Sequence, residues 1–233
     1  MAKIHRFIDN FDLSQKELQI EGEIANQIIK VLKLRIGEKV ELGNGKDAVA
    51  FGEIKEKRKK DIVIKIERII KKKECEKQTT LFCAILKKEN FELVVQKTTE
   101  CGIHKIVPIV TSRTIKNGLN IERLKRIVKE ACEQSGRFTL PEINEVISFE
   151  KSLDLTKEND TNILFDMSGL PLDDKNINSK KIGIWIGPEG GWTEEEIKKT
   201  RDISSFAIKS LGTNILRAET AAIISSYLIS HLK

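Results

Sequence analysis

Short apolar runs of strand length alternate with segments of helical spacing from residue 79 to the end of the chain. The run 79–86 is continuous and apolar, which is typical of a strand buried in a parallel sheet. We expect strands at 79–86, 105–110, 162–165, 181–186 and 205–209, and helices at 89–100, 121–135, from 193 onward and at 218–232. This alternation predicts an α/β domain with a mostly parallel sheet.

The first third of the chain has a different pattern. Segments 38–42, 49–54 and 61–66 are short and β-branched, and Gly43-Asn44-Gly45 is a turn signal between the first two. Residues 24–32 have helical spacing. A small β-barrel with one helix is therefore predicted, with the cationic run 57–60 at a hairpin tip, where it is either a solvated loop or a phosphate contact.

The excess positive charge lies in this first third. Residues 1–73 hold 18 Lys and Arg against 12 Asp and Glu, whereas residues 74–233 hold 23 of each. Such asymmetry indicates a polyanionic partner, although a solubilising surface would give the same charge. The polar segment 71–77 is expected to be a linker. We therefore predict two domains, 1–72 and 73–233.

Composition excludes several classes of protein. An apolar fraction of 39% is too high for a disordered chain, and no apolar run approaches the length of a membrane span. With no signal-peptide region, the protein is expected in the cytoplasm. Cysteines 75, 83, 101 and 132 show no metal-finger spacing, so reduced structural thiols are favoured over a nucleophile or metal ligand.

Two loops could bind a ligand. Residues 183–193 run from a buried strand through Gly187, Gly190 and Gly191 to a helix start, where glycines allow close approach to the backbone. A tight strand–helix connection is the alternative. Residues 211–221 repeat the arrangement, with Arg217 and Glu219 at the helix start; taken alone, this segment is better explained as a helix cap with a surface ion pair.

These two loops resemble the 16S ribosomal RNA uracil-N3 methyltransferase family of the SPOUT superfamily. The similarity lies in IGPEGGWTEEEI at 186–197 and LGTNILRAETAA at 211–222. It continues in HRFI at 5–8, VLKLRIGEKVEL at 31–42, QKTTECGI at 96–103, PIVTSRT at 108–114 and EACEQSGRFTLPEI at 130–143. These words occur in the family's order over almost the whole chain.

The resemblance implies an N-terminal PUA-like, OB-related β-barrel and a C-terminal methyltransferase domain with a trefoil knot. It also implies S-adenosylmethionine as methyl donor, without a metal, because a sulfonium is already electrophilic. The residues expected to bind this cofactor are Leu164, Phe165, Asp166, Met167, Gly187, Glu189, Gly190, Gly191, Leu211, Gly212, Ile215, Leu216, Arg217 and Ala221.

The implied reaction is methylation of N3 of one uridine in the decoding region of 16S rRNA within the 30S subunit. Because N3 must lose its proton, Arg217 is a candidate to stabilise the uracil anion, and Glu219 is a candidate base or a partner that orients Arg217. Candidate RNA contacts are His5, Arg6, Arg113, Gln134 and Arg137. Each arginine among them is as consistent with a surface ion pair.

The resemblance further implies a homodimer, for which the apolar helix at 218–232 is the expected interface, although core packing would explain its apolar stripe too. Two alternatives stay open for the function. One is another SPOUT methyltransferase that modifies transfer RNA or a ribose hydroxyl. The other is a noncatalytic RNA-binding factor of ribosome assembly.

Overall fold

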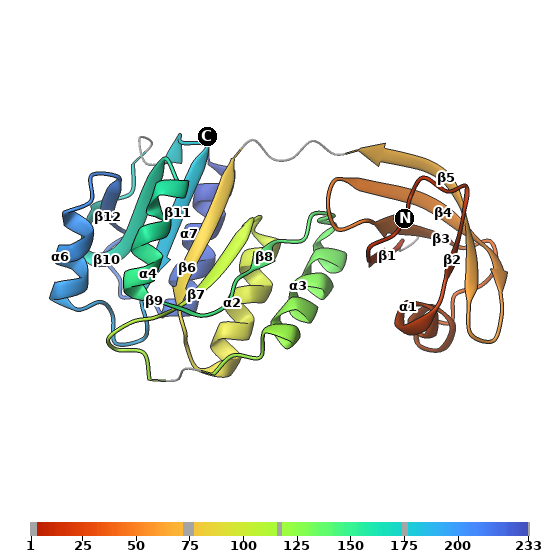
Figure 1. The fold of residues 1–233 in the computed structure, drawn as a ribbon, viewed down its shortest axis with the longest axis horizontal. Coiled ribbons are helices and arrows are strands. Elements are labelled where there is room, and N and C mark those ends of the chain that lie inside the picture. Colours follow the sequence, from red (N-terminus) through yellow and green to blue (C-terminus); the bar gives the residue numbers. More distant parts are fainter. Residues whose placement is uncertain (1–3, 72–76, 116–117, 174–176, 233) are drawn as a thin grey trace. The chain divides into compact units, whose positions relative to one another are not determined.

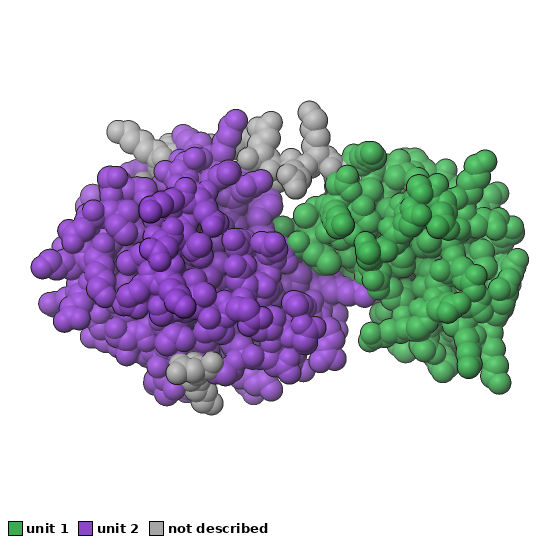
Figure 2. Space-filling model, viewed as in Figure 1, with its two compact units in different colours: residues 1–74, 132–140 green, residues 75–131, 141–233 purple. Residues whose placement is uncertain are grey.

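The parallel sheet predicted from residue 79 onward is present in the computed structural model, which describes residues 4–71, 77–115, 118–173 and 177–232. The chain divides into two units, one formed by Met1–Glu74 with Cys132–Leu140 and the other by Cys75–Ala131 with Pro141–Lys233 (Figure 2). The first unit thus includes a segment from the middle of the chain. The expected linker at 71–77 falls largely outside the described residues.

The first unit is a five-stranded mixed sheet with the order β1-β3-β4-β5-β2 (Figure 1). Its elements are β1 (His5–Ile8), β2 (Glu17–Ile20), α1 (Gly22–Asn26), the π-helical turn η1 (Gln27–Val31), β3 (Lys39–Gly43), β4 (Ala48–Lys57) and β5 (Ile62–Lys71). The sequence predicted β3, β4 and β5 but did not predict β1 and β2, which have only four residues each.

The sheet of the first unit bends around an apolar core. The register of β4 and β5 shifts beside Gly52, where a Cβ atom would lie 2.6 Å from Ile64 Cγ2. Bulges of this kind increase the twist and curvature of a sheet. Phe7, Leu42 and Ile54 from the strands pack in one cluster with Ile28 of η1.

The second unit has a seven-stranded sheet in which all strand pairs among the described residues are parallel. The strand order is β12-β10-β11-β6-β7-β8, with β9 also paired to β7. The strands are β6 (Gln78–Ala84), β7 (Lys105–Val110), β8 (Glu142–Ile143), β9 (Ile147–Ser148), β10 (Thr161–Pro171), β11 (Lys181–Ile186) and β12 (Phe206–Ser210). This order brings the carboxyl ends of β10, β11, β12 and β6 to one edge.

Helices cover the sheet of the second unit (Figure 1). They are α2 (Lys88–Glu100), α3 (Ile121–Ser135), α4 (Phe149–Asp154), the 3₁₀ turn η2 (Leu155–Glu158), α6 (Glu194–Arg201) and α7 (Ala218–His231). Helix α7 packs against α2, β6 and β11. Trp185 of β11 stacks on Phe82 of β6 with ring centroids 3.9 Å apart and lies in one cluster with Phe149 of α4. The predicted α/β class is confirmed.

Candidate functional site

A cavity of about 540 Å³ opens in the second unit, at the carboxyl ends of β11 and β12 and where β10 leaves its pairing with β11. This is the edge of an open parallel sheet at which ligands usually bind. Its lining consists of Lys87, Asn90, Phe165, Asp166, Met167, Ile186, Gly187, Pro188, Glu189, Gly191, Trp192, Leu211, Asn214, Ile215, Leu216, Arg217, Ala218, Glu219 and Ala221.

Trp192 packs against the loop after β11 and joins this loop to β10. A Cβ atom on Gly187 would lie 3.1 Å from the Trp192 ring, so the ring and the loop backbone are in close contact. Trp192 Nε1 donates to the carbonyl oxygen of Phe165 at 3.1 Å, which ties this loop to β10. Gly191 has a φ of +69°, a conformation that favours glycine. The loop after β11 and part of β10 therefore lie together in the lining of the cavity.

Arg113, in the segment after β7, holds the same loop. Its Nη1 donates to the carbonyl oxygens of Gly190, at 2.7 Å, and Trp192, at 3.2 Å. Beside it, the buried carboxylate of Glu196 accepts from the backbone N–H of Ser112 at 2.9 Å. Glu196 also completes the predicted capping box with Thr193 at the start of α6. The segment after β7 thus fixes the carboxyl-terminal end of the glycine loop and the start of α6.

Glu189 links the cavity to α2. Its Oε1 accepts from the backbone N–H of Lys87, at 3.3 Å, where α2 begins. A carboxylate is favourable there, because the first N–H groups of a helix lack partners and the helix dipole is positive at this end. Elsewhere in the lining, Asp166 Oδ1 accepts from the backbone N–H and the hydroxyl of Ser168, at 2.8 and 2.7 Å.

Arg217 and Glu219 lie together at the start of α7. Arg217 Nη1 is 3.9 Å from Glu219 Oε1, and the two side chains differ sharply in exposure, at 84% and 10%. The arginine therefore extends into the open mouth of the cavity, whereas the glutamate lies in its wall. An exposed pair of this kind stabilises the fold little, which leaves the guanidinium available to a ligand.

Most of the predicted cofactor residues lie in this lining, and three do not. Leu164 is fully buried in the sheet. Gly190 is held through its carbonyl oxygen by Arg113, and Gly212, with a φ of +116°, shapes the turn after β12. The sequence missed Lys87, Asn90, Ile186, Pro188, Trp192, Asn214 and Ala218. Lys87 and Asn90 follow β6, the neighbour of β11, so the argument from strand ends could have found them.

The lining carries two cations, Lys87 and Arg217, and three carboxylates, Asp166, Glu189 and Glu219, among apolar side chains. Such a set suits an organic ligand with charged groups and an apolar ring. Among the described residues, no group of three or more His, Cys, Asp or Glu is arranged to hold a metal ion. No helix in the described part of the chain is long and apolar enough to cross a membrane.

The three described cysteines are not suited to act as nucleophiles. Burial raises the pKa of the Cys83 thiol far above its ordinary value, and the carboxylates of Glu189 and Glu219 add to the effect. Burial also raises the pKa of Cys132, to about 11, and that of Cys101. All three are free thiols, and a protonated thiol is a weak nucleophile. Cys75 lies outside the described residues.

The predicted RNA contacts of the first unit surround the segment 132–140. Arg6 Nε donates to Glu41 Oε2 at 2.6 Å, and its guanidinium lies 3.3 Å from where a Cβ of Gly136 would stand. Glu133 Oε1 accepts from the backbone N–H of Ile8 at 2.9 Å. Of the remaining candidates, His5 and Arg137 are half-buried and Gln134 is exposed. Arg6 and Glu133 therefore join the segment to β1 and β3.

Comparisons with known proteins agree with this architecture. A family model described as an RNA methyltransferase domain matches residues 73–230, and one described as an RNA methyltransferase PUA domain matches residues 20–67. Ribosomal RNA small subunit methyltransferase E of Rickettsia conorii is 33% identical over 199 residues, which cover 83% of this chain and 80% of the relative.

Two solved structures are similar over nearly the whole chain. Ribosomal RNA small subunit methyltransferase E from Neisseria gonorrhoeae, bound to S-adenosylmethionine, superimposes with a TM-score of 0.91 at 28% identity and covers 99% of this chain and 98% of its own. A protein from Legionella pneumophila, described as a methyltransferase in complex with the same cofactor, gives 0.86 at 26% identity, with coverages of 98% and 97%.

These matches confirm the predicted PUA domain followed by a methyltransferase domain, while the trefoil knot stays a prediction. The chain belongs to the RNA methyltransferase family that contains ribosomal RNA small subunit methyltransferase E.

Proposed function

We propose that this protein methylates N3 of one uridine in the decoding region of 16S rRNA in the 30S subunit, with S-adenosylmethionine as methyl donor. The observation that carries the proposal is the cavity beside β10, β11 and β12, whose lining contains most of the residues that the family resemblance assigned to the cofactor. Support also comes from the relatives named for small-subunit rRNA methylation and from those solved with S-adenosylmethionine.

The residues of the cavity fit this cofactor. Ile186, Leu211 and Leu216 offer apolar surface for a purine ring, and the glycine loop exposes backbone groups for hydrogen bonds. Asp166 and Glu189 provide negative charge for the sulfonium and amino groups. When bound, S-adenosylmethionine supplies an electrophilic methyl group.

The uracil ring must be made nucleophilic at N3 by the enzyme. N3 carries a proton and is a poor nucleophile until that proton leaves, after which the charge spreads over the two carbonyl oxygens. Arg217, which reaches into the cavity mouth, is proposed to stabilise that charge. Glu219, 3.9 Å from the guanidinium, is proposed to accept the N3 proton or to hold Arg217 in place.

The RNA partner explains further features. The pairing edge of the uridine must be open, so the base is unpaired or flipped toward the cavity. His5, Gln134 and Arg137 are proposed RNA contacts, while Arg6 and Arg113 act at least partly by holding segment 132–140 and the glycine loop. The site of action is proposed to be the cytoplasm, where 30S subunits are found.

A homodimer is part of the proposal. Helix α7 exposes Ile224 (37%) and Tyr227 (56%), and Leu93 (39%) is exposed on α2, against which α7 packs. These side chains supply an apolar face for a second copy of the chain. The molar mass in solution, with Tyr227→Glu as the disrupting variant, tests this part.

The proposal is tested by incubating 30S subunits from cells lacking the protein with the purified enzyme and isotopically labelled S-adenosylmethionine. Digestion to nucleosides and mass spectrometry should then show label in 3-methyluridine. Label in a ribose-methylated nucleoside would favour another SPOUT activity, and absence of label from rRNA would favour a noncatalytic assembly factor.

A further inference from the structure

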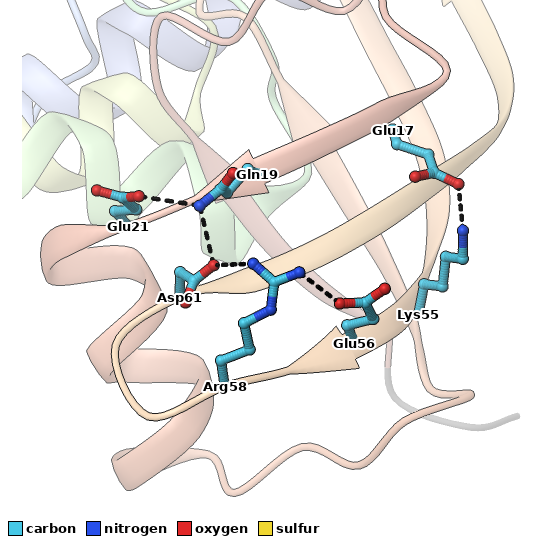
Figure 3. A network of polar contacts seen from close by, with 7 residues as sticks. All are labelled: Glu17, Gln19, Glu21, Lys55, Glu56, Arg58 and Asp61. Carbon is cyan, nitrogen blue, oxygen red and sulfur yellow. Dashed lines mark hydrogen bonds and ion pairs between the residues drawn. The ribbon is translucent and has the colours of Figure 1, made fainter.

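Some Lys and Arg side chains of the first unit form ion pairs with carboxylates, whereas others do not. At the hairpin between β4 and β5, Arg58 donates to both Glu56 and Asp61, at 2.6 and 3.2 Å, and Lys55 bonds to Glu17 (Figure 3). The hairpin tip predicted as a possible phosphate contact therefore has its arginine neutralised by neighbouring carboxylates, while its Lys59 and Lys60 are exposed and form no ion pair among the described residues. Net charge alone does not locate an anion-binding surface on this unit.

A different segment keeps its positive charge unpaired. Residues 30–37, called here the basic loop, comprise the last two residues of η1 and most of the connection to β3, and carry Lys30, Lys33 and Arg35 with exposed side chains. No ion pair to any of these three is present within the described ranges. Three cationic side chains within six residues thus face solvent without an ion pair, and the nearby Glu38 carboxylate accepts from the backbone N–H of Arg35 at 3.0 Å.

Leu34 anchors the basic loop to the core of the first unit. The Leu34 side chain is buried in the core, its N–H donates to Ile28 O at 3.0 Å, and its carbonyl oxygen accepts from Lys57 Nζ at 3.0 Å. At the end of the loop, Gly37 N–H donates to Ile54 O at 2.9 Å. The exposed cations therefore project from a fixed backbone, which lowers the entropy lost on binding.

Lys33 adds a strained conformation to this loop. Its φ of +53° makes it the one non-glycine residue in the left-handed region among those the structure describes. For a residue with a side chain this conformation costs roughly 1–2 kcal/mol. Strain of this kind is concentrated at ligand contacts, and here it aims a cation away from the core.

Large apolar side chains flank the cations. Val31 is 72% exposed and Ile36 is 62% exposed. Single exposed apolar residues are ordinary, but Val31 and Ile36 lie on either side of Lys33 and Arg35, and Val31 directly follows Lys30. The combination fits a partner that presents negative charges beside apolar ring faces, as single-stranded or looped RNA does.

We infer that the basic loop is the RNA-docking element of the first unit, with Lys30, Lys33 and Arg35 on phosphates and Val31 and Ile36 against an unpaired base. The inference rests on the proposed function for the identity of the RNA. Charge complementarity selects RNA over a protein partner. It assigns the electrostatic role to one loop rather than to the whole basic surface.

The test measures binding of the full-length protein to protein-free 16S rRNA and to 30S subunits over a range of salt concentrations. The loop variant combines Lys30→Gln, Lys33→Gln and Arg35→Gln. The matched control combines Lys16→Gln, Lys55→Gln and Lys65→Gln, which remove the same charge from exposed side chains around Glu17.

The loop variant should lower the slope of log affinity against log salt by about 2–3, on the order of one for each lost phosphate contact. The control should leave the slope unchanged. Equal losses in the two variants would mean that only net charge matters and would overturn the inference. A loss confined to 30S subunits, with the salt slope intact, would place the loop on a ribosomal protein and overturn it too.

Lys33→Gly provides a second readout. Glycine adopts the left-handed region without strain, so this variant should unfold at a temperature equal to or above that of the wild type while binding RNA several-fold more weakly. Full RNA affinity in Lys33→Gly would contradict the inference. Methyl transfer is not read in either experiment, so a failure of the proposed reaction would leave this result interpretable.

Discussion

Arg113 Nη1 lies 2.7 Å from the carbonyl oxygen of Gly190, so a residue after β7 holds the glycine loop that follows β11. The two residues are far apart in the sequence and come from strands separated by β6 in the sheet. Gly190 has a backbone free to bend, and the guanidinium supplies the donor that fixes it. The shape of the cavity therefore depends on a residue outside its lining.

Arg113→Ala should weaken S-adenosylmethionine binding by roughly tenfold to a hundredfold, because the freed loop must be ordered on binding at the expense of about one charged hydrogen bond, which contributes about 1.5–3 kcal/mol. Isothermal titration calorimetry measures the change. Arg126→Ala, an exposed arginine on α3, is the control and should bind as the wild type does. Equal affinities for all three proteins would show that the loop is stable without Arg113.

Arg217→Gln should lower turnover by roughly a hundredfold or more while cofactor affinity changes little. The guanidinium is 84% exposed and is proposed to act on charge that develops only during the reaction. Steady-state methylation of 30S subunits, with calorimetry on the same protein, separates the two effects. A fall in cofactor affinity with unchanged turnover would reassign Arg217 to cofactor binding.

Gly183→Ala should destabilise the second unit by about 1–3 kcal/mol. The new Cβ would lie 2.3 Å from the ring of Trp185 and 2.7 Å from the side chains of Asn159 and Asn162. Urea unfolding measures the loss. Gly118→Ala, which meets nothing within 4 Å, should remain within about 0.5 kcal/mol of wild type. Similar stability of the two variants would contradict the packing at β11.

The buried thiol of Cys132 makes stability depend on alkaline pH. Its pKa is about 11 in the folded protein, against an ordinary value of 9.0, so the unfolded chain loses the proton first. The contribution is complete below pH 9 and is lost as the pH rises toward 11, by roughly 2–3 kcal/mol. Urea midpoints between pH 8 and 11 should fall less steeply for Cys132→Ala. Parallel profiles would show that Cys132 does not contribute.

Periodicity predicted the sheet of the second unit well, because continuous apolar runs and amphipathic helices leave strong local signals. Strands β1 and β2 were missed since each has four residues and depends on pairing with distant strands for its stability. The return of segment 132–140 to the first unit was also hidden. Glu133 and Gly136 contact Ile8 and Arg6, more than a hundred residues away.

The site was predicted in part. Glycines after strand ends located the loops at 187 and 212, because a glycine in the sequence directly indicates a backbone with greater conformational freedom. Lys87 and Asn90 were missed, since nothing in their own segment marks a ligand and only the order of β6 beside β11 brings them into the lining. The role of Arg113 was likewise invisible, because its partners are backbone oxygens.

The central claim is tested most directly by reverse transcription across small-subunit RNA from cells with and without this protein. A methyl group on N3 blocks the pairing edge of uracil, so the account predicts one strong stop at a uridine of the decoding region that depends on the protein. The Arg217→Gln variant should fail to restore this stop. Absence of any protein-dependent stop in the wild type would contradict the account.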